Sequence, residues 1–283
     1  MPTDNSEQIA DWNGAMGRLW AENQREIDAV VVPFGVAALA TAAPRAGERV
    51  IDVGCGCGDT TIEIARVVGE RGSVLGVDVS QPMLEVARHR ASRAGATNLE
   101  FREGDASAAP LPAGMDLLFS RFGVMFFGEP TAAFRHLRAS LRAGGRCVFV
   151  CWRTPRDNAW AMAPLAAARA AMAVTPPPAD PNAPGPFAFA DEARVRTLLT
   201  EAGFAGMEFR RFDQMLALGE TAQDATEYAM RIGPTSRFAR EMGDAHLPTI
   251  RKAVEQAFAQ LAAADGRVNL VGSAWIVSAT NPA

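Results

Sequence analysis

The sequence lacks any run of about 18 apolar residues, which is the minimum length of a membrane-spanning helix. Its first residues, Met1 to Glu7, also lack the basic and apolar segments of a secretory signal peptide. The two absences together predict a cytoplasmic protein with no membrane span.

An excess of basic residues is also missing. The chain has 28 Lys and Arg against 32 Asp and Glu, a formal net charge of −4. Binding to nucleic acid needs a basic face that neutralises phosphates, so nucleic acid is not expected as a partner. The densest basic cluster, which includes Arg88, Arg90 and Arg93, has helical spacing and is interpreted as a solvated helix face.

Cysteine is scarce, with four residues at positions 55, 57, 147 and 151. Cys55 and Cys57 are too close in the chain for an ordinary structural disulfide. The four thiols could hold zinc, but we prefer the interpretation that they fill tight loop and strand positions in a reducing compartment. No metal site is therefore predicted.

A chain of 283 residues with 48% hydrophobic content can bury a sizeable core. From Arg49 onward, short β-branched runs alternate with helical patterns, which is typical of a doubly wound α/β fold with a parallel sheet. The expected strands cover residues 50–53, 74–78, 99–102, 115–120, 146–152, 207–213 and 273–278.

The rest of the chain is organised around a glycine loop at residues 50–59. A β-branched run, Val50–Val53, leads into Gly54, Gly56 and Gly58, and helical character begins at Thr60. Glycine permits positive φ and close approach of a ligand to the backbone, and a helix start leaves amide groups free. The loop is therefore expected to bind a flat nucleoside ligand.

The spacing of the glycines distinguishes between nucleoside ligands. A dinucleotide fingerprint needs a glycine at position 59, where this chain has Asp59. The pattern acid-x-G-x-G-x-G, led by Asp52, resembles the first motif of the class I S-adenosylmethionine-dependent methyltransferases. A second strand ending in Asp78, about 20 residues past the glycines, supplies the acid expected to bind a ribose.

The resemblance covers residues 45–152 and implies a seven-stranded, mostly parallel sheet with an antiparallel edge strand and S-adenosylmethionine as cofactor. Because ligands of such sheets lie at the carboxyl ends of the strands, Asp52, Asp78 and Asp105 should converge there. Asp105 matches the family position facing the adenine, although it could instead be a helix cap or turn residue. The predicted cofactor-binding residues are Asp52, Gly54, Cys55, Gly56, Gly58, Thr60, Asp78, Val79, Met83, Gly104, Asp105, Ala106 and Ser120.

We expect four segments along the chain: an N-terminal helical lid at 1–45, a cofactor-binding core at 46–152, a cover insertion at 153–192 and the end of the sheet at 193–283. The cover contains six prolines between Thr175 and Phe187, so regular structure is not expected there. The last segment should carry a helical substrate cap at about residues 214–265.

Large apolar side chains outside the expected sheet suggest a pocket for a methyl acceptor. An exposed Met-Phe-Phe loop after the fourth strand would be costly, so it either packs or lines a pocket. The N-terminal aromatic residues could likewise form a lid or merely attach the segment to the core. The predicted substrate-binding residues are Trp12, Met16, Trp20, Met125, Phe126, Trp152 and Phe187.

Methyl transfer from a sulfonium is an in-line displacement that requires alignment more than acid–base groups. His246 and Tyr228 are weak candidates for a base, and no catalytic residue is assigned. The chain has neither the Asn/Asp-Pro-Pro-Tyr/Phe motif of nucleic-acid and glutamine N-methyltransferases nor a Pro-Cys nucleophile.

The chain is most similar to small-molecule methyltransferases of ubiquinone and menaquinone biosynthesis, which implies a small, partly apolar acceptor. Two alternatives stay open: a catalytically silent S-adenosylmethionine-binding module and a nicotinamide-dependent oxidoreductase. The acceptor, the methylated atom and the oligomeric state are not predicted.

Overall fold

The computed structural model describes residues 5–175, 180 and 183–282, which divide into two compact units. The larger unit comprises the chain up to Trp152 with residues 182–212 and 274–283, and the smaller unit comprises residues 153–181 and 213–273.

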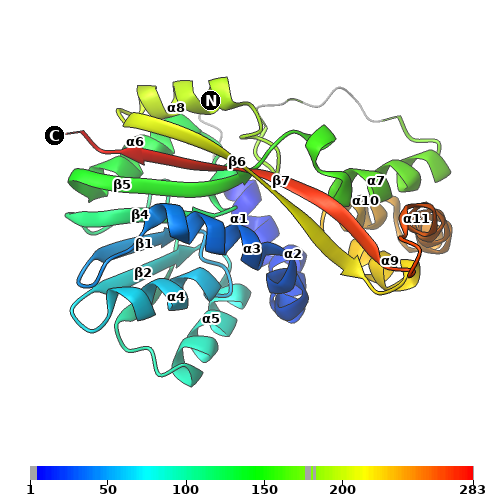
Figure 1. Ribbon diagram of the computed structural model, residues 1–283, viewed down its shortest axis with the longest axis horizontal. Coiled ribbons are helices and arrows are strands. Elements are labelled where there is room, and N and C mark those ends of the chain that lie inside the picture. Colours follow the sequence, from blue (N-terminus) through cyan, green and yellow to red (C-terminus); the bar gives the residue numbers. More distant parts are fainter. Residues whose placement is uncertain (1–4, 176–179, 181–182, 283) are drawn as a thin grey trace. The chain divides into compact units, whose positions relative to one another are not determined.

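A seven-stranded sheet forms the centre of the larger unit (Figure 1). Its strand order is β3-β2-β1-β4-β5-β7-β6, and all pairings among the first five strands are parallel. This confirms the predicted doubly wound, mostly parallel fold. The strands are β1 (Arg49–Val53), β2 (Ser73–Asp78), β3 (Leu99–Glu103), β4 (Met115–Arg121), β5 (Leu141–Trp152), β6 (Ala205–Gly219) and β7 (Val268–Thr280).

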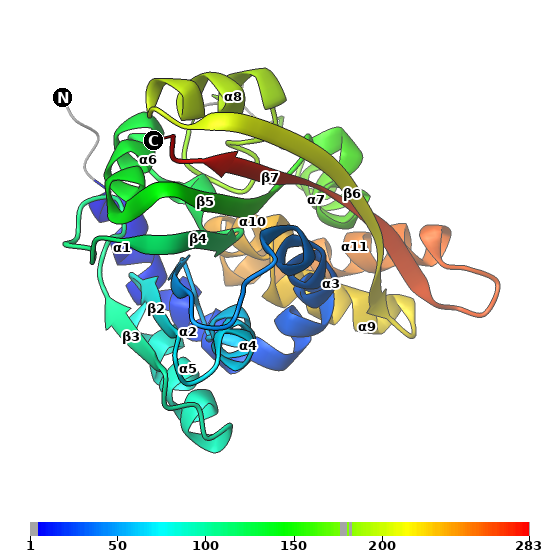
Figure 2. The same cartoon turned by 60° about the vertical axis from the view of Figure 1, so that its left-hand side comes forward.

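The family resemblance implied that the antiparallel strand lies at the edge of the sheet, and this expectation is wrong. Strand β7 runs antiparallel to β5 and lies between β5 and β6 (Figure 2), so β6 is the edge strand. The burial of the two strands gives the reason, because β7 is largely buried whereas most residues of β6 are exposed or half-buried. A strand with a polar, solvated face can occupy an edge, and an apolar strand needs partners on both sides.

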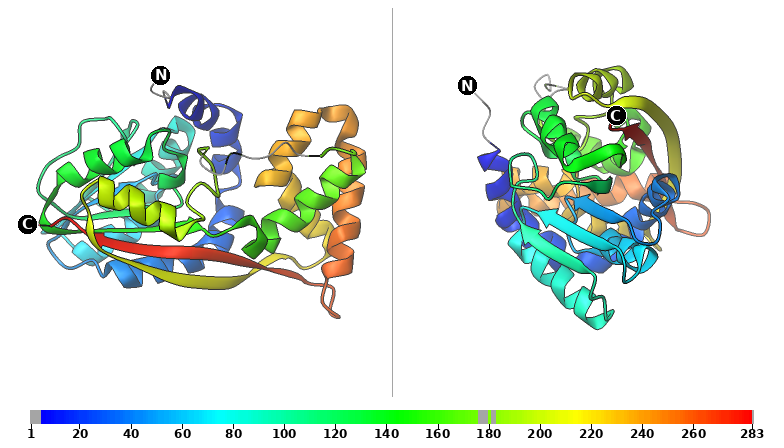
Figure 3. Two further views of the ribbon diagram at one scale, coloured as in Figure 1. Left: turned by 90° about the horizontal axis from the view of Figure 1, so that it is seen from above. Right: turned by 90° about the vertical axis from the view of Figure 1, so that its left-hand side faces the viewer.

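Helices cover both faces of this sheet. Helices α3 (Gln24–Ala42) and α4 (Asp59–Val68) lie on one face, and α6 (Pro130–Ser140) and α8 (Glu192–Glu201) lie on the other (Figure 3, right). Helix α5 (Gln81–Arg93) packs on β3, and the N-terminal helices α1 (Ser6–Asn13) and α2 (Ala15–Glu22) precede α3. A short 3₁₀ turn, η1 (Val124–Phe126), follows β4.

The core of the larger unit lies between the sheet and these helices. Phe119 on β4, Phe149 on β5 and Phe134 on α6 are almost completely buried. Because the central parallel strands are covered on both faces, the runs at residues 50–53, 117–120 and 147–152 are buried throughout and, apart from Asp52 and Ser120, are apolar, which explains the continuous hydrophobic runs in the sequence.

The smaller unit is mainly helical. Helix α11 (Leu247–Leu261) packs against α7 (Ala159–Ala171) and α9 (Ala222–Arg231), and α10 (Pro234–Met242) packs against α7. The 3₁₀ turns η2 (Pro155–Asp157) and η3 (Asp244–His246) precede α7 and α11. Ile250, Val254 and Phe258, one face of α11, are completely buried. The two halves of each long strand belong to different units: β6 enters this unit after Phe212, and β7 leaves it after Ser273.

The helices of the structure fall within the predicted segments as follows. The described part of the segment at 1–45 contains α1, α2 and α3, and the segment at 214–265 contains α9, α10 and α11. Most of the proline-rich stretch, at residues 176–179 and 181–182, lies outside the described residues. Within the part of the chain that the structure describes, none of the helices has the length and apolarity needed to cross a membrane.

Candidate cofactor and acceptor site

The glycine loop between β1 and α4 has the geometry that its spacing predicts. Gly54, Gly56 and Gly58 have φ values of 66°, 53° and 81°, a region that side-chain-bearing residues rarely adopt. The loop is also tightly enclosed, since a Cβ at Gly54 would lie 2.7 Å from Gly123 Cα and one at Gly58 would lie 2.8 Å from Phe101 Cζ. Larger residues are therefore excluded by both conformation and space.

Asp78, at the carboxyl end of β2, is hydrogen-bonded directly to this loop. Its Oδ2 accepts a hydrogen bond of 2.8 Å from the Gly56 amide, and its Oδ1 accepts one of 2.8 Å from the Ser80 amide. Burial raises the pKa of the Asp78 carboxyl, while the amide hydrogen bonds from Ser80 and Gly56 oppose that rise. The loop and the acid expected to bind a ribose thus form one hydrogen-bonded unit.

Asp52, the first acid of the motif, is completely buried at the end of β1. Its Oδ2 accepts hydrogen bonds of 2.7 Å from the hydroxyls of Thr60 and Thr61. Its Oδ1 has no hydrogen-bond partner among the described residues. Burial raises the pKa of this carboxyl to about 6, although the two hydroxyls lower it. A buried carboxylate oxygen without a donor is an uncompensated site that a cationic group would satisfy.

Helix α4 starts next to this oxygen. No side chain of the described chain caps its first turn, so its leading amides stay available to an anion. An acceptor for an ammonium group and donors for a carboxylate therefore occur at the same loop. This combination fits the amino-acid part of S-adenosylmethionine, and the Asp78 carboxylate fits its ribose hydroxyls.

The remaining predicted cofactor residues surround the same carboxyl edge of the sheet. The amides of Gly54 and Cys55 donate to the Val77 carbonyl, and the Gly104 amide donates to the Asp78 carbonyl at 2.9 Å. Met83 packs against Gly56, because a Cβ there would lie 2.9 Å from Met83 Cε. Ala106 and Ser120 are also buried, and Ser120 Oγ accepts a hydrogen bond from the Gly123 amide.

Asp105 has one of the roles that the sequence left open, that of a turn residue, and it also contacts the N-terminal segment. Its Oδ1 accepts a hydrogen bond of 2.9 Å from the Ser107 amide, which is the role of a turn residue. Its Oδ2 accepts one of 3.0 Å from Asn5 Nδ2, before the start of α1. The N-terminal segment therefore reaches the position that the family resemblance assigns to the adenine.

Three further hydrogen bonds attach the N-terminal helices to the residues that follow β2. Ser80 Oγ donates to the Trp12 carbonyl at 2.7 Å, and Asn13 Nδ2 donates to the Val79 carbonyl at 2.6 Å. The Asn13 Oδ1 accepts a hydrogen bond from the Gln81 amide at 2.9 Å. Sequence reasoning did not identify Asn5 or Asn13, because an asparagine near a helix end has no signature that separates a cap from a long-range contact.

Six of the seven predicted acceptor residues fall into two groups. In the first group, Trp12 packs edge to face against Trp20 and Phe126, with ring centroids 5.4 and 5.3 Å apart. These three rings and Met16 are half-buried, so each keeps some accessible surface. They come from α1, α2 and η1, and the Trp12 and Phe126 rings are in contact as the pocket hypothesis requires.

Met125 and Trp152 form the second group and are almost completely buried. The Trp152 amide lies 3.4 Å from Met125 Sδ, and the Trp152 ring stacks on Phe122 with centroids 4.1 Å apart. Such burial favours packing over a pocket wall. Phe122, which the sequence analysis did not single out, has a φ of 61°, unusual for a bulky residue. Phe187 is half-buried and stays a prediction.

The two weak candidates for a base both lie in the smaller unit. His246 is exposed in η3, and Tyr228 is buried on α9, where burial raises the pKa of its phenol well above the usual value. A higher pKa leaves less phenolate to accept a proton near neutral pH. Neither observation supports a catalytic role for these residues.

Four cysteines are free and buried, and burial raises the pKa of each thiol: Cys55, Cys57, Cys147 and Cys151. For Cys57 the pKa reaches about 12. Among the described residues, no three His, Cys, Asp or Glu side chains gather in a way that could hold a metal ion.

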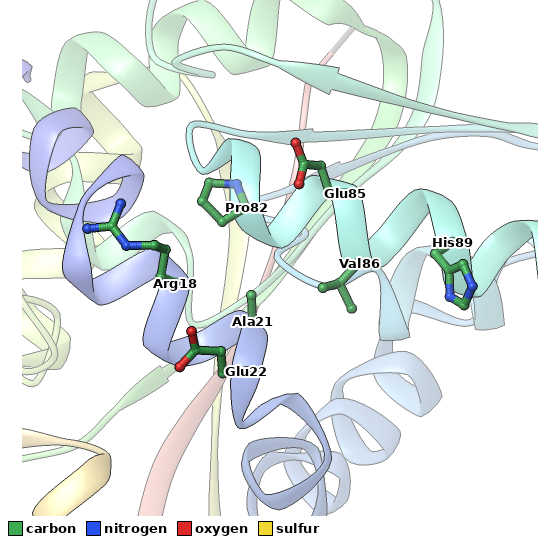
Figure 4. Close-up of a pocket in the computed structure, with 7 residues that line it drawn as sticks. All are labelled: Arg18, Ala21, Glu22, Pro82, Glu85, Val86 and His89. Carbon is green, nitrogen blue, oxygen red and sulfur yellow. The ribbon is translucent and has the colours of Figure 1, made fainter.

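A shallow hollow of about 420 Å³ lies between α2 and α5 (Figure 4). Charged side chains such as Arg18 and Glu85 border it, and Ala21, Pro82 and Val86 also contribute to its lining. None of the predicted cofactor residues lines this hollow, so it is separate from the glycine loop.

A parallel sheet of this order with an acid-led glycine loop and a second acid at the end of β2 defines a nucleoside-binding α/β protein. A family profile described as a methyltransferase domain matches residues 44–203, which is more than half of the chain. The chain therefore belongs to the S-adenosylmethionine-dependent methyltransferases of this domain family.

Curated relatives agree with this membership. Aklanonic acid methyltransferase DauC from Streptomyces sp. strain C5 is 34% identical over 118 residues, which cover 41% of this chain and 54% of that protein. The ubiquinone/menaquinone biosynthesis C-methyltransferase UbiE from Azotobacter vinelandii is 32% identical over 147 residues, with coverages of 51% and 53%. The chain thus spans about half the length of the curated relatives it matches.

Solved structures support the fold. A YcgJ protein from Bacillus subtilis has a TM-score of 0.58 at 19% identity and covers 88% of this chain and 98% of its own. A putative methyltransferase from Bacillus halodurans C-125 has a TM-score of 0.59 at 20% identity, with coverages of 88% and 99%.

Proposed function

We propose that this protein transfers a methyl group from S-adenosylmethionine to a small, partly apolar acceptor. The observation that carries the proposal is the buried Asp52 Oδ1, which lacks a partner within the described structure beside the uncapped start of α4. Of the nucleoside ligands considered, S-adenosylmethionine brings an amino acid with both an ammonium and a carboxylate. A nicotinamide dinucleotide brings a pyrophosphate, which a buried carboxylate would repel.

In the proposed mechanism, bound S-adenosylmethionine supplies a methyl group on a sulfonium sulfur, open to in-line attack by the acceptor. Asp78 would hold the ribose hydroxyls, Asp52 the ammonium group and the first amides of α4 the carboxylate. The N-terminal helices, fastened to β2 through Ser80 and Asn13, would exclude water from the site. We assign no general base, because alignment and desolvation account for much of such a reaction.

The acceptor would lie against the half-buried aromatic rings of Trp12, Trp20 and Phe126. Such rings provide apolar contact surface for an organic molecule and few polar anchors. The names of the two curated relatives denote a methyltransferase acting on aklanonic acid and a C-methyltransferase of quinone biosynthesis. We propose an acceptor of this general kind, small and partly apolar.

Calorimetric titration tests the cofactor part of this proposal. The protein should bind S-adenosylmethionine and S-adenosylhomocysteine and should not bind NAD⁺ or NADP⁺. Incubation with S-adenosylmethionine and a panel of phenols, quinones and aromatic polyketides, followed by mass spectrometry, should reveal an acceptor that gains a methyl group. Binding of a dinucleotide would refute the proposal, and binding without turnover on any acceptor would favour the silent module.

A further inference from the structure

Four charged side chains from four elements close a ring beside the glycine loop. Asp28 on α3 and Asp59 at the start of α4 each bridge the same two arginines, Arg90 on α5 and Arg121 at the end of β4. The nitrogen–oxygen distances are 3.0 and 3.1 Å from Arg90 to Asp28 and Asp59, and 3.3 and 2.8 Å from Arg121 to the same acids.

The position of Arg90 corrects an expectation from the sequence. Arg90 is not part of a solvated helix face, because its side chain is only 25% exposed and turns toward the glycine loop. Its Nη1 also donates a hydrogen bond of 3.0 Å to the Cys57 carbonyl. The helical spacing of the basic cluster could not show this, since the two acids that pair with Arg90 come from other elements.

The ring holds the last turn of the glycine loop from two sides. Asp59 follows Gly58 directly, so the contacts of its carboxylate with Arg90 and Arg121 fix the residue at which the loop becomes α4. The hydrogen bond from Arg90 to Cys57 fixes the backbone two residues earlier. The segment from Cys57 to Asp59 is therefore anchored to α5 and to β4.

Helix α3 lies close to Arg121 because it has a glycine, Gly35, where it faces this arginine. Gly35 is two turns from Asp28 on the same helix face, and a Cβ there would lie 3.1 Å from Arg121 Cδ and 3.3 Å from its Nη1. Glycine at this position lets α3 approach Arg121. The side chains of Asp28 and Arg121 are only 14% and 12% exposed, so solvent screens their interaction less than that of a surface pair.

We propose that Asp28, Arg90 and Arg121 are positioning residues for the cofactor. Through Asp59 and the Cys57 carbonyl they hold the glycine loop in the conformation that binds S-adenosylmethionine, and Asp28 makes this conformation depend on α3. The proposal rests on the proposed function, because it takes S-adenosylmethionine as the ligand of the loop.

The test is a titration of Asp28→Asn and Arg90→Lys with S-adenosylmethionine and with S-adenosylhomocysteine. Arg90→Lys keeps the charge but removes the planar fork that contacts both acids and Cys57. Both variants should bind both ligands about tenfold more weakly, as loss of one charge-assisted contact in a shared network predicts. Hydrogen exchange of the ligand-free variants should be faster at residues 55–61.

Glu48→Gln is the matched control. Glu48 forms a bidentate pair with Arg146 at 2.8 and 2.9 Å, with side-chain exposures of 11% and 24% that resemble those of the ring. Arg146 also donates to the Ala42 carbonyl at the end of α3. Glu48 lies before β1, whereas the glycine loop lies after β1, so the Glu48–Arg146 pair does not contact the loop. Glu48→Gln should therefore lower the melting temperature and leave cofactor affinity unchanged.

Three results would overturn the role of the ring: unchanged affinity in both ring variants, an equal loss of affinity in Glu48→Gln, or a loss confined to the cationic ligand. The last result would indicate a change of local charge instead of loop position. Wild-type protein that binds neither ligand would overturn the proposed function itself, and the wild-type titration separates that failure from the other three.

Discussion

The carboxylate of Asp78 and the amide of Gly56 are joined by a hydrogen bond of 2.8 Å that connects the end of β2 to the glycine loop. The residue expected to bind the ribose therefore also determines the shape of the loop. Loss of Asp78 should thus have a larger effect than loss of a single ligand contact.

Asp78→Ala should raise the dissociation constant for S-adenosylmethionine about 10- to 100-fold, because charge-assisted hydrogen bonds are worth about 1.5–3 kcal/mol. Calorimetric titration measures the change. Glu100→Ala, which removes an exposed acid of the neighbouring strand β3, serves as the control and should bind normally. A wild-type titration curve for Asp78→Ala would remove Asp78 from the cofactor site.

The burial of Asp52 predicts a pH-dependent stability. Its pKa is about 6 in the folded protein against the usual 3.8, so the folded state holds the proton more tightly than the unfolded state. The protonated carboxyl therefore contributes its full stabilisation below about pH 3.8, and this contribution is lost as the pH rises through about 6. The free energy of unfolding falls by about 3 kcal/mol over this range as a result.

Asp52→Asn removes this titration. Urea unfolding of both proteins between pH 4 and 8 should show that the variant gains stability relative to wild type as the pH rises. The other carboxyl groups are common to both proteins and cancel in the comparison. A constant difference across this range would mean that Asp52 titrates in the folded protein as it does in the unfolded chain.

Gly17 on α2 should be essential for the attachment of the N-terminal helices. A Cβ at this position would lie 1.8 Å from the Trp12 carbonyl oxygen and 2.4 Å from Ser80 Oγ, which are hydrogen-bonded to each other. Gly17→Ala should therefore displace α1 and α2 and expose them to limited proteolysis, while the sheet melts near its normal temperature. Ala15→Ser, at an exposed position of α2, should resist proteolysis as wild type does.

Trp12→Ala and Phe126→Ala test the acceptor pocket. Both rings keep accessible surface, so their truncation should preserve the melting temperature and keep cofactor affinity within a few-fold, while most methyl transfer to an identified acceptor is lost. Phe134→Ala, in the fully buried core, should instead cost about 3–5 kcal/mol of stability. Unfolding of the first two variants would assign their side chains to the core.

The order of strands and helices up to Trp152 could be read from the sequence because buried parallel strands leave continuous β-branched runs between helical patterns. The lengths of β6 and β7 could not be predicted from the sequence. Strand β6 continues past its predicted end at Asp213 to Gly219, and the polar pair Asp213 and Gln214 resembles a turn when the edge position of the strand is unknown. The central position of β7 depends on pairing across the sheet, which local patterns do not encode.

For the candidate site, the glycines and the acids that follow strands carry local signatures, and these residues do lie together at the carboxyl ends of the parallel strands. The ring of Asp28, Asp59, Arg90 and Arg121 has no such signature, since each charge taken alone resembles a solvated residue. Only the fold brings them together. Asn5 and Asn13 lack such a signature as well, because their partners Asp105 and Val79 lie far along the chain.

The place of β7 between β5 and β6 has a consequence for the order in which the protein is assembled during synthesis. Strand β6 joins the sheet only through β7, so residues 205–219 leave the ribosome well before the strand that will pair with them. During that interval β5 and β6 both present unpaired backbone groups, a condition that favours association with other chains. The nascent protein should therefore depend most on chaperones between the synthesis of Ala205 and that of Thr280.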